Sequence, residues 1–366
     1  MKVLVTGGAG FIGSHIVDLY IKNGYEVIII DDLSTGKAEY VNPKAKFYKL
    51  DINELNLNDN KLEDVFKDEK PDVINHHAAQ ISVSESVKDP VFDANVNILG
   101  TLNLLENCVK YNVKKFIFAS TGGAIYEETE KIPADENHPT RPLSPYGVSK
   151  LAIENYLYFY KKVHNLDSII FRYSNVYGPR QDPYGEAGVV AIFINKMLKG
   201  ENPIIYGDGN QTRDFVYISD AAQSNLLALK ISLENENKSN INLKDEFKNK
   251  IKGDVVSKGR IESKNKKGNN RIEKDKNTNN GTIINDIAIF NIGTGIETSV
   301  NEIFCKLKKI TKTNVKEIHG PPKLGELRRS CLNCNKAKKI LCWEPEVYID
   351  QGLKLTVNYF KKQLSH

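Results

Sequence analysis

The sequence lacks long apolar runs, and no stretch approaches the roughly 20 consecutive apolar residues that a membrane-spanning helix requires. Its start, MKVLVTGG, also lacks the charged region, apolar core and cleavage site of a secretory signal peptide. Cysteine is scarce, and five thiols in 366 residues, an odd number, do not indicate a disulfide framework. These absences favour a cytoplasmic protein without contact to a membrane.

A charge excess of one sign is also missing from most of the chain. The formal net charge is +5 (51 Lys and Arg, 46 Asp and Glu), but residues 231–280 hold 13 of the basic and 8 of the acidic residues, which leaves 38 of each elsewhere. Because the basic excess is confined to that segment, the rest of the chain has no feature of a nucleic-acid-binding protein.

What the sequence does contain is an alternation of short β-branched runs with amphipathic helical stretches. Buried strands are expected at residues 2–7, 26–32, 46–52, 71–78, 114–121 and 168–178. Apolar strands separated by helices indicate βαβ units, so the predicted fold class is α/β, with a Rossmann-type doubly wound parallel sheet. Beyond Pro179 glycine and proline become frequent, which predicts a smaller C-terminal lobe built from excursions off the main sheet.

Residues 231–286 differ in composition from the rest of the chain. They contain 12 asparagines, many lysines and one aromatic residue, Phe247. Such a segment cannot bury enough apolar area to offset its chain entropy, so a disordered surface insertion is expected. A tail that binds a partner is the alternative.

A glycine-rich turn follows the first expected strand. Gly7, Gly10 and Gly13 in TGGAGFIGS come directly after KVLV and open a helix, an arrangement that lets the backbone approach a pyrophosphate at a helix N-terminus. The second strand ends in Asp31, 18 residues beyond Gly13. A carboxylate there can accept hydrogen bonds from the adenosine ribose and would repel a 2′-phosphate, so the expected cofactor is NAD rather than NADP.

A second motif lies in SPYGVSKLAIENYLYFYKK, where Ser144 and Pro145 form a plausible helix start. Tyr146 and Lys150 are four residues apart and therefore project from one face of that helix. An ammonium group near a phenol favours the phenolate, so Lys150 is expected to lower the pKa of Tyr146 towards neutral pH. Such a tyrosine can exchange a proton with a sugar hydroxyl while hydride moves to or from a nicotinamide, and Thr121 could bind the same hydroxyl.

The chain resembles the extended short-chain dehydrogenase/reductases (the NAD-dependent epimerase/dehydratase family), and among them most closely the UDP-glucose 4-epimerases. The resemblance rests on Asp31 and on the segments TGGAGFIGS, STGGAIY, SPYGVSK, RYSNVYGPRQDP, TRDFVYISDAA and FNIGTG. It runs from residue 1 to about 230 and resumes at residue 288, so it covers nearly everything except the insertion.

This resemblance implies a mainly NAD-binding Rossmann domain at residues 1–178 and a mainly nucleotide-sugar-binding lobe at residues 179–366, interrupted by the insertion at 231–286. It also implies a homodimer that pairs through the two apolar helices expected at residues 97–109 and 149–163. The implied cofactor contacts are Gly7, Gly10, Phe11, Ile12, Gly13, Asp31, Asp32, Asp51, Ile52, Ala78, Ala79, Gln80, Asn95, Tyr146, Lys150 and Tyr173. The implied substrate contacts are Ser120, Thr121, Asn175, Val189, Ile204, Tyr206, Arg213, Lys323, Glu326 and Ser330.

The implied reaction is 4-epimerisation of UDP-glucose and UDP-galactose, and by extension their N-acetyl forms, through transient oxidation at carbon 4. Related dehydratases place an acidic pair just after the Thr121 position, whereas Gly122 and Gly123 stand there in this chain. A reductase, a decarboxylase or a dehydratase of the same family is the alternative, and so is a catalytically weak NAD-binding regulator or scaffold. Ser330, where sugar-restricted relatives carry tyrosine, predicts room for an acetamido group, although a slip of one residue in the alignment would put Arg329 there.

Four positions depart from the family pattern. Glu127 and Cys342 stand where glycine is usual, and Glu127 would strain the turn if its φ were positive. Lys323 replaces a diphosphate-binding arginine and loses its bidentate fork, and Asn333 replaces an aspartate.

Two further features are interpreted as structural. Cys331 and Cys334 form a single CxxC, which is too few ligands for a structural zinc site, so no metal is expected. His76 and His77 end a buried strand beside the expected cofactor, where a packing role is favoured over catalysis.

Arg213 suits a diphosphate, with a surface ion pair to Asp214 as the alternative.

Overall fold

The computed structural model describes residues 1–53, 61–127, 131–184, 188–231, 288–322 and 327–364. The chain divides into two units, Met1–Ile231 together with Asp286–His366, and Ser232–Asn285. The second unit coincides with the expected insertion and lies outside the described residues. All of the described residues belong to the first unit.

A parallel sheet of seven strands forms the centre of this unit, with the order β10-β6-β5-β4-β1-β2-β3. The predicted α/β, Rossmann-type fold is thus confirmed. The inner strands are buried, as their almost continuous runs of Val, Ile and Phe require, whereas the edge strand β3 (KFYK) is exposed or half-buried. Their bounds are β1 Lys2–Thr6, β2 Glu26–Asp31, β3 Lys46–Lys49, β4 Val73–His76, β5 Lys115–Thr121, β6 Asp167–Tyr173 and β10 Ala288–Ile292.

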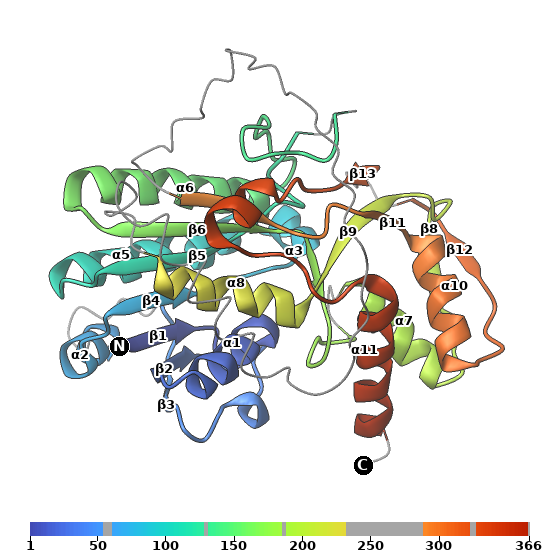
Figure 1. The fold of residues 1–366 in the computed structure, drawn as a ribbon, viewed down its shortest axis with the longest axis horizontal. Helices are drawn as coiled ribbons and strands as arrows, with labels where there is room; N and C mark the ends of the chain where they lie inside the picture. The colour runs from blue at the N-terminus through green and yellow to red at the C-terminus, as the bar shows by residue number, and fades with distance from the viewer. Residues whose placement is uncertain (54–60, 128–130, 185–187, 232–287, 323–326, 365–366) are drawn as a thin grey trace, which may run out of the picture. The chain divides into compact units, whose positions relative to one another are not determined.

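Helices cover both faces of the sheet (Figure 1). On one face α2 (Lys61–Glu69), α5 (Gly100–Lys110) and α6 (Pro145–His164) share an apolar core with the strands. On the other face α1 (Phe11–Lys22) packs beside α8 (Ile218–Lys230). A buried polar contact joins these two helices to the sheet, because Asn75 Nδ2 donates to Tyr20 Oη (2.7 Å) and to Asn225 Oδ1 (3.0 Å).

The helix that carries the Tyr-x-x-x-Lys motif begins as the sequence predicts. Ser144 is the N-cap of α6 and accepts a hydrogen bond from the Gly147 amide at 3.2 Å, and Pro145 occupies the first helical position. α6 ends at Asn165, which takes the left-handed conformation (φ 54°) common after helices. A run of short helices, α3 (Val83–Lys88), α4 (Pro90–Ala94) and the wide helical turn Asn95–Leu99, leads into α5.

The C-terminal half forms a smaller assembly beside the main sheet and also returns β10 to that sheet. Its four-stranded sheet pairs β11 and β13 with β9, and β7 with the far end of β9, while β8 and β12 form a separate pair. A second apolar core joins β7, β8 and β9 to α7, α10 and α11 and to the first residue of α8. The bounds of its strands are β7 Asn175–Tyr177, β8 Ile204–Tyr206, β9 Thr212–Tyr217, β11 Glu297–Ser299, β12 Ile318–Gly320 and β13 Arg329–Ser330. Its helices are α7 Val189–Leu198, α10 Val300–Thr311 and α11 Ile349–Leu364, and a short helical turn spans Ala337–Leu341. A further short turn, Ala38–Tyr40, lies in the N-terminal half between β2 and β3.

The predicted boundary between residues 178 and 179 falls just after β7, and as a domain boundary it stays a prediction. Within the part of the chain that the structure describes, no helix is both long enough and apolar enough to cross a membrane.

Candidate functional site

The glycine-rich turn joins β1 to α1 and leaves no room for side chains. A Cβ atom on Gly13 would lie 2.1 Å from the Gly7 carbonyl oxygen, and one on Gly7 would lie 2.6 Å from the Ala78 amide nitrogen. Gly7 also takes φ +67°, a conformation that only glycine adopts without strain. The turn therefore offers bare backbone at the N-terminus of α1, which suits an approaching pyrophosphate.

Asp31 at the end of β2 is tied to that turn. Its Oδ2 accepts a hydrogen bond from the Ala9 amide and its Oδ1 accepts one from the Leu33 amide, both at 2.9 Å. Burial raises the pKa of the Asp31 carboxyl, and these two amide hydrogen bonds act in the opposite direction. The neighbouring Asp32 accepts from the amide and hydroxyl of Ser34. A buried carboxylate thus stands beside the glycine turn, where the adenosine ribose of a dinucleotide is expected.

The other expected cofactor contacts follow the carboxyl ends of the strands. Asp51 and Ile52 follow β3, Ala78, Ala79 and Gln80 follow β4, Tyr173 ends β6, and Asn95 opens the wide turn before α5. Because the ends of parallel strands meet at one edge, these residues share the edge with the glycine turn. Phe11 and Ile12 instead pack their side chains against the second apolar core.

Tyr146 and Lys150 lie in the first two turns of α6. The Lys150 Nζ atom is 5.9 Å from the centre of the Tyr146 ring and 4.9 Å from the centre of the Phe118 ring. Thr121, at the end of β5, lies near the Tyr146 phenol and acts to lower its pKa. The structure therefore brings the three expected catalytic residues together at the carboxyl edge of the sheet.

The expectation that Lys150 lowers the pKa of Tyr146 is wrong for the chain alone. Burial and then the charge of Asp93 raise the pKa of the Tyr146 phenol to about 12, and the influence of the Thr121 side chain opposes them only in part. Burial also lowers the pKa of Lys150 to about 8, although Asp93 acts in the other direction. Loss of water therefore favours the neutral form of both groups.

Asp93 is a buried carboxylate that the sequence analysis did not single out. Its Oδ1 accepts hydrogen bonds from Gln80 Nε2 (2.9 Å) and Asn97 Nδ2 (3.0 Å), and its Oδ2 accepts one from Ser149 Oγ (2.5 Å). Its charge influences both members of the candidate acid/base pair. The signal in the sequence is slight, because the second aspartate of DPVFDANV resembles an ordinary helical residue.

The two histidines after β4 have different surroundings. His76 is buried, and its ring nitrogens contact Thr6 Oγ1 at 2.7 Å and Thr101 Oγ1 at 2.9 Å, which confirms the packing role expected for it. Both ring nitrogens of His77 are buried, and neither has a hydrogen-bond partner among the described residues. The His77 ring centre lies 6.1 Å from that of Tyr173.

Most of the expected substrate contacts line the strands of the smaller assembly. Ser330 in β13 pairs with Arg213 in β9, and Arg329 pairs with Thr212. The Arg329 guanidinium binds Glu297 (Nη2 to Oε2, 2.6 Å), which supports Ser330 rather than Arg329 as the residue beside Arg213. The remaining positions are Asn175 in β7, Val189 at the start of α7, and Ile204 and Tyr206 in β8.

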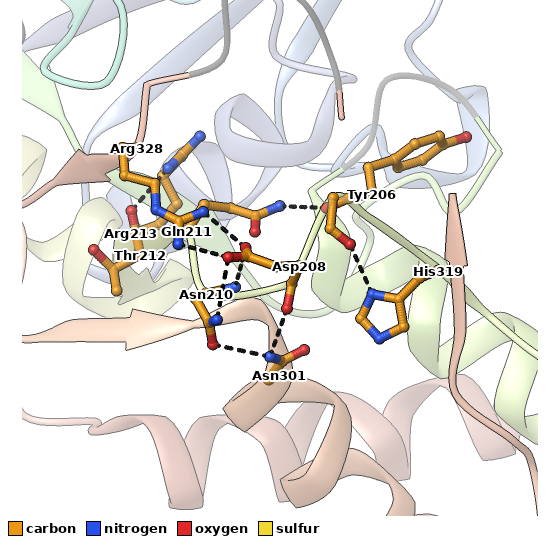
Figure 2. A network of polar contacts seen from close by, with 10 residues as sticks. Tyr206, Asp208, Asn210, Gln211, Thr212, Arg213, Asn301, His319 and Arg328 are labelled. Atoms are coloured by element: carbon orange, nitrogen blue, oxygen red, sulfur yellow. Dashed lines mark hydrogen bonds and ion pairs between the residues drawn. The ribbon is translucent and has the colours of Figure 1, made fainter. Parts of the chain in front are cut away.

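A polar network supports the turn between β8 and β9 (Figure 2). Arg328 holds Asp208 through two hydrogen bonds of 2.7 and 2.8 Å, and Asn301 Nδ2 donates to the Asp208 carbonyl at 3.0 Å. His319 Nδ1 lies 2.7 Å from the Gly207 carbonyl oxygen. The network therefore fixes the segment between Tyr206 and Arg213 through side chains of Asn301, His319 and Arg328, which come from later in the chain.

Ser120, an expected substrate contact, and Asp214, the alternative partner of Arg213, both form hydrogen bonds inside the fold. The Ser120 hydroxyl donates to Glu154 Oε1 at 2.5 Å inside the fold, so its contact with substrate stays a prediction. Asp214, the alternative partner for Arg213, is buried and accepts hydrogen bonds from the amides of Thr294, Gly295 and Leu332. Lys323 and Glu326 lie outside the described residues.

The departures from the family pattern have unequal consequences. Glu127 is not among the described residues with positive φ, so the expected strain is absent there. Cys342 does take φ 54°, where a glycine would be unstrained. Asn333 donates its amide hydrogen to the Ala134 carbonyl at 2.7 Å. No group of three or more His, Cys, Asp or Glu side chains suited to a metal occurs in the described parts of the chain, Cys331 and Cys334 included.

The two glycines after Thr121 differ in the space around them. A Cβ on Gly122 would lie 2.6 Å from the Leu332 side chain, whereas one on Gly123 would meet Thr121 Oγ1 and Asn175 Oδ1 only at 3.8 and 3.9 Å. The first position therefore has no room for an acidic side chain unless Leu332 moves.

The chain matches a family model described as the NAD dependent epimerase/dehydratase family over residues 3–243. It is 44% identical to a UDP-glucose 4-epimerase of Thermotoga maritima solved with UDP-glucose, over all of both chains and with a TM-score of 0.82. It is 38% identical to a Thermus thermophilus UDP-glucose 4-epimerase in complex with NAD, over 99% of each chain, TM-score 0.80. A UDP-N-acetylglucosamine 4-epimerase of Methanobrevibacter ruminantium, in complex with UDP-N-acetylmuramic acid, is 31% identical over 99% of this chain and 98% of that one, TM-score 0.77.

Proposed function

The chain belongs to the NAD dependent epimerase/dehydratase family, and we propose that it is a UDP-sugar 4-epimerase that works with bound NAD. The observation that carries this proposal is the group of Thr121, Tyr146 and Lys150 at the same sheet edge as the glycine turn. An epimerase at carbon 4 must remove and return a hydride at that carbon and a proton at its hydroxyl oxygen, which requires an acid/base group beside a hydride acceptor.

The residues present fit a dinucleotide. The turn at Gly7 and Gly13 has a shape that any Cβ would destroy, and Asp31 stands beside it as a buried carboxylate. Gly7, Gly10 and Gly13 would hold the pyrophosphate, and Asp31 the adenosine ribose. When bound, NAD supplies the hydride acceptor and a positive charge close to the catalytic pair.

Tyr146 acts first as base and then as acid. Its pKa of about 12 in the chain alone must fall before the phenol can accept a proton from the carbon 4 hydroxyl. Lys150, with a pKa of about 8, is mostly protonated at neutral pH, and its charge favours the phenolate once the site also holds the cofactor. The Thr121 hydroxyl, which lies near the phenol and lowers its pKa, would bind the same carbon 4 hydroxyl. After the 4-keto sugar has turned over, Tyr146 returns the proton.

The substrate class follows from the relatives and from the smaller assembly. Arg213 suits the diphosphate, because a guanidinium group binds phosphate oxygens with a planar fork. Ser330 lies next to it in register and leaves space beside the sugar, so the proposal includes N-acetylated UDP-sugars. UDP-glucose and UDP-galactose remain the first substrates to test.

The test is incubation of the purified protein, as isolated, with UDP-galactose, UDP-glucose and their N-acetyl forms, followed by analysis of product stereochemistry. We expect inversion at carbon 4 without added cofactor. A need for added reduced cofactor would favour a reductase. Absence of turnover on all four sugars, with NAD bound, would favour an NAD-binding regulator or scaffold.

A homodimer is part of the same proposal. Exposed apolar side chains form a stripe along α6, at Val148, Tyr156, Phe159 and Val163, and Val91 of α4 is exposed as well. Residues at this helical spacing lie on one face, and a second copy would cover it through the same patch.

A cytoplasmic location is also proposed, because all five cysteines are free thiols.

A further inference from the structure

His77 has a buried imidazole that the fold does not use. Both ring nitrogens are shielded from solvent and have no partner among the described residues, whereas the preceding His76 is bonded through both nitrogens. Buried polar groups are normally satisfied, and an exception in a folded protein needs an explanation such as an absent ligand. A leucine or phenylalanine would serve packing at this position without that cost.

The position of His77 suggests which ligand satisfies it. Its backbone adjoins the glycine turn, because a Cβ on Gly7 would lie 2.7 Å from the His77 carbonyl carbon. On the other side its ring is 6.1 Å from the Tyr173 ring, and the charge of Lys150 contributes to the low pKa of the imidazole. His77 thus lies between the pyrophosphate turn and the catalytic pair.

A dinucleotide must span these same two points. The hydride leaves carbon 4 and the proton leaves the oxygen bonded to that carbon, so the nicotinamide end has to lie against Tyr146, while the pyrophosphate lies on the glycine turn. The segment between them is the nicotinamide riboside, whose ribose hydroxyls and carboxamide both donate and accept hydrogen bonds.

We infer that His77 is a positioning residue that hydrogen-bonds the nicotinamide riboside half of the bound NAD and retains it through turnover. The inference rests on the proposed function. One ring nitrogen donates and the other accepts, so a neutral imidazole can hold a hydroxyl or a carboxamide in a fixed orientation.

The electrostatics support a neutral role. Burial, and then the charge of Lys150, lower the pKa of His77 to about 3. The imidazole therefore stays uncharged at every working pH. It does not move protons in the reaction, and it adds no positive charge beside the oxidised nicotinamide.

The test uses the protein as isolated and compares His77→Phe, which keeps a ring of similar size, with His77→Gln, which keeps a donor and an acceptor. His164→Phe, an exposed histidine at the end of α6, is the matched control. The readouts are the NAD retained per subunit after gel filtration, the rate of exchange of bound NAD with excess radiolabelled NAD, and the far-ultraviolet circular dichroism spectrum.

We expect His77→Phe to fold normally and to exchange NAD about tenfold faster than wild type, equivalent to about 1.4 kcal/mol. His77→Gln should recover most of the retention, and His164→Phe should match wild type. Equal exchange rates in wild type and His77→Phe would overturn the inference while leaving the proposed function intact. If His77→Phe folds poorly, the test rests on His77→Gln alone. NAD exchange in His77→Gln more than tenfold faster than in wild type, although glutamine keeps a donor and an acceptor, would overturn the inference. A wild-type protein that binds no NAD would overturn both.

Discussion

Tyr146 shows most clearly how one residue depends on its surroundings. Burial and the charge of Asp93 place the pKa of its phenol at about 12, so in the chain alone the group is protonated and poorly suited to act as a base. The proposed mechanism therefore requires positive charge from Lys150 and from the cofactor to act on the same oxygen.

The first prediction is that Tyr146→Phe lowers kcat about 10²–10⁴-fold while bound NAD is unchanged, because the phenol is the only proton carrier proposed for the carbon 4 hydroxyl. The check is a steady-state assay on UDP-galactose together with the NAD content per subunit. A mutant that keeps more than a tenth of the wild-type rate would contradict the assignment.

The second prediction concerns Ser330. We expect the wild type to accept UDP-N-acetylglucosamine, and Ser330→Tyr to lose this activity more than tenfold while activity on UDP-glucose is kept, because a ring at this position fills the space of the acetamido group. The control is Arg329→Gln, which removes the pairing with Glu297 on the neighbouring residue of β13. Retention of N-acetyl activity in Ser330→Tyr would show that the pocket lies elsewhere.

The third prediction concerns Cys342, which is exposed and takes φ 54°. Glycine adopts this conformation without steric cost, so Cys342→Gly should stabilise the protein by about 1 kcal/mol. Cys305→Gly is the matched control, since this exposed cysteine lies inside α10, where glycine should destabilise by a similar amount. Thermal unfolding of both variants measures the two signs, and a lower midpoint for Cys342→Gly would contradict the account.

Residues whose role is set by local geometry could be predicted from the sequence. The glycine turn, Asp31 and the spacing of Tyr146 and Lys150 all depend on a few consecutive residues. The pKa of Tyr146 could not be predicted, because it depends on Asp93, a residue of another helix whose side chain is brought near by folding. The difference between His76 and His77 was equally hidden, since it depends on the distant hydroxyls of Thr6 and Thr101.

At the scale of elements, α6 is attached to the sheet by a buried ion pair. Arg172 of β6 donates to both carboxylate oxygens of Glu154 on α6 (Nε–Oε1 3.0 Å, Nη2–Oε2 2.6 Å), and Ser120 of β5 donates to the same carboxylate. Because Ser120 directly precedes Thr121 in β5, these contacts fix α6, which carries Tyr146, against the strand that carries Thr121.

The fourth prediction is that Glu154→Gln destabilises the protein by about 3–5 kcal/mol, because it leaves the Arg172 guanidinium buried without a counter-charge. Glu201→Gln removes an exposed pair with Lys196 and should cost less than about 1 kcal/mol. Urea unfolding at fixed pH compares the two. Similar midpoints for both variants would show that the buried pair does not anchor α6.

The long strands of the main sheet were predictable because parallel strands buried on both faces consist of continuous apolar runs. In the smaller sheet β7 lies within the strand predicted at residues 168–178, but β11, with three residues, and β13, with two, could not be predicted. Such short strands are defined by their partners in β9 rather than by any periodicity of their own.

At the scale of the whole molecule, the exposed apolar stripe of α6 is the basis of the fifth prediction. Phe159→Asp should convert a dimer to a monomer, because it places a charge in the middle of the proposed interface. Leu355→Asp, at an exposed apolar position on α11, is the control and should leave the mass unchanged. Light scattering at micromolar concentration decides, and a wild-type monomer would contradict the proposal.

The central claim is that one bound NAD takes hydride from carbon 4 and returns it to the same carbon. The most direct measurement uses UDP-galactose that carries deuterium at carbon 4, with enzyme as isolated and no added cofactor. The account predicts UDP-glucose that retains the deuterium at carbon 4, and no such product with Tyr146→Phe. Absence of the inverted sugar, or an inverted sugar that has lost its deuterium to the solvent or to an added cofactor, would contradict it.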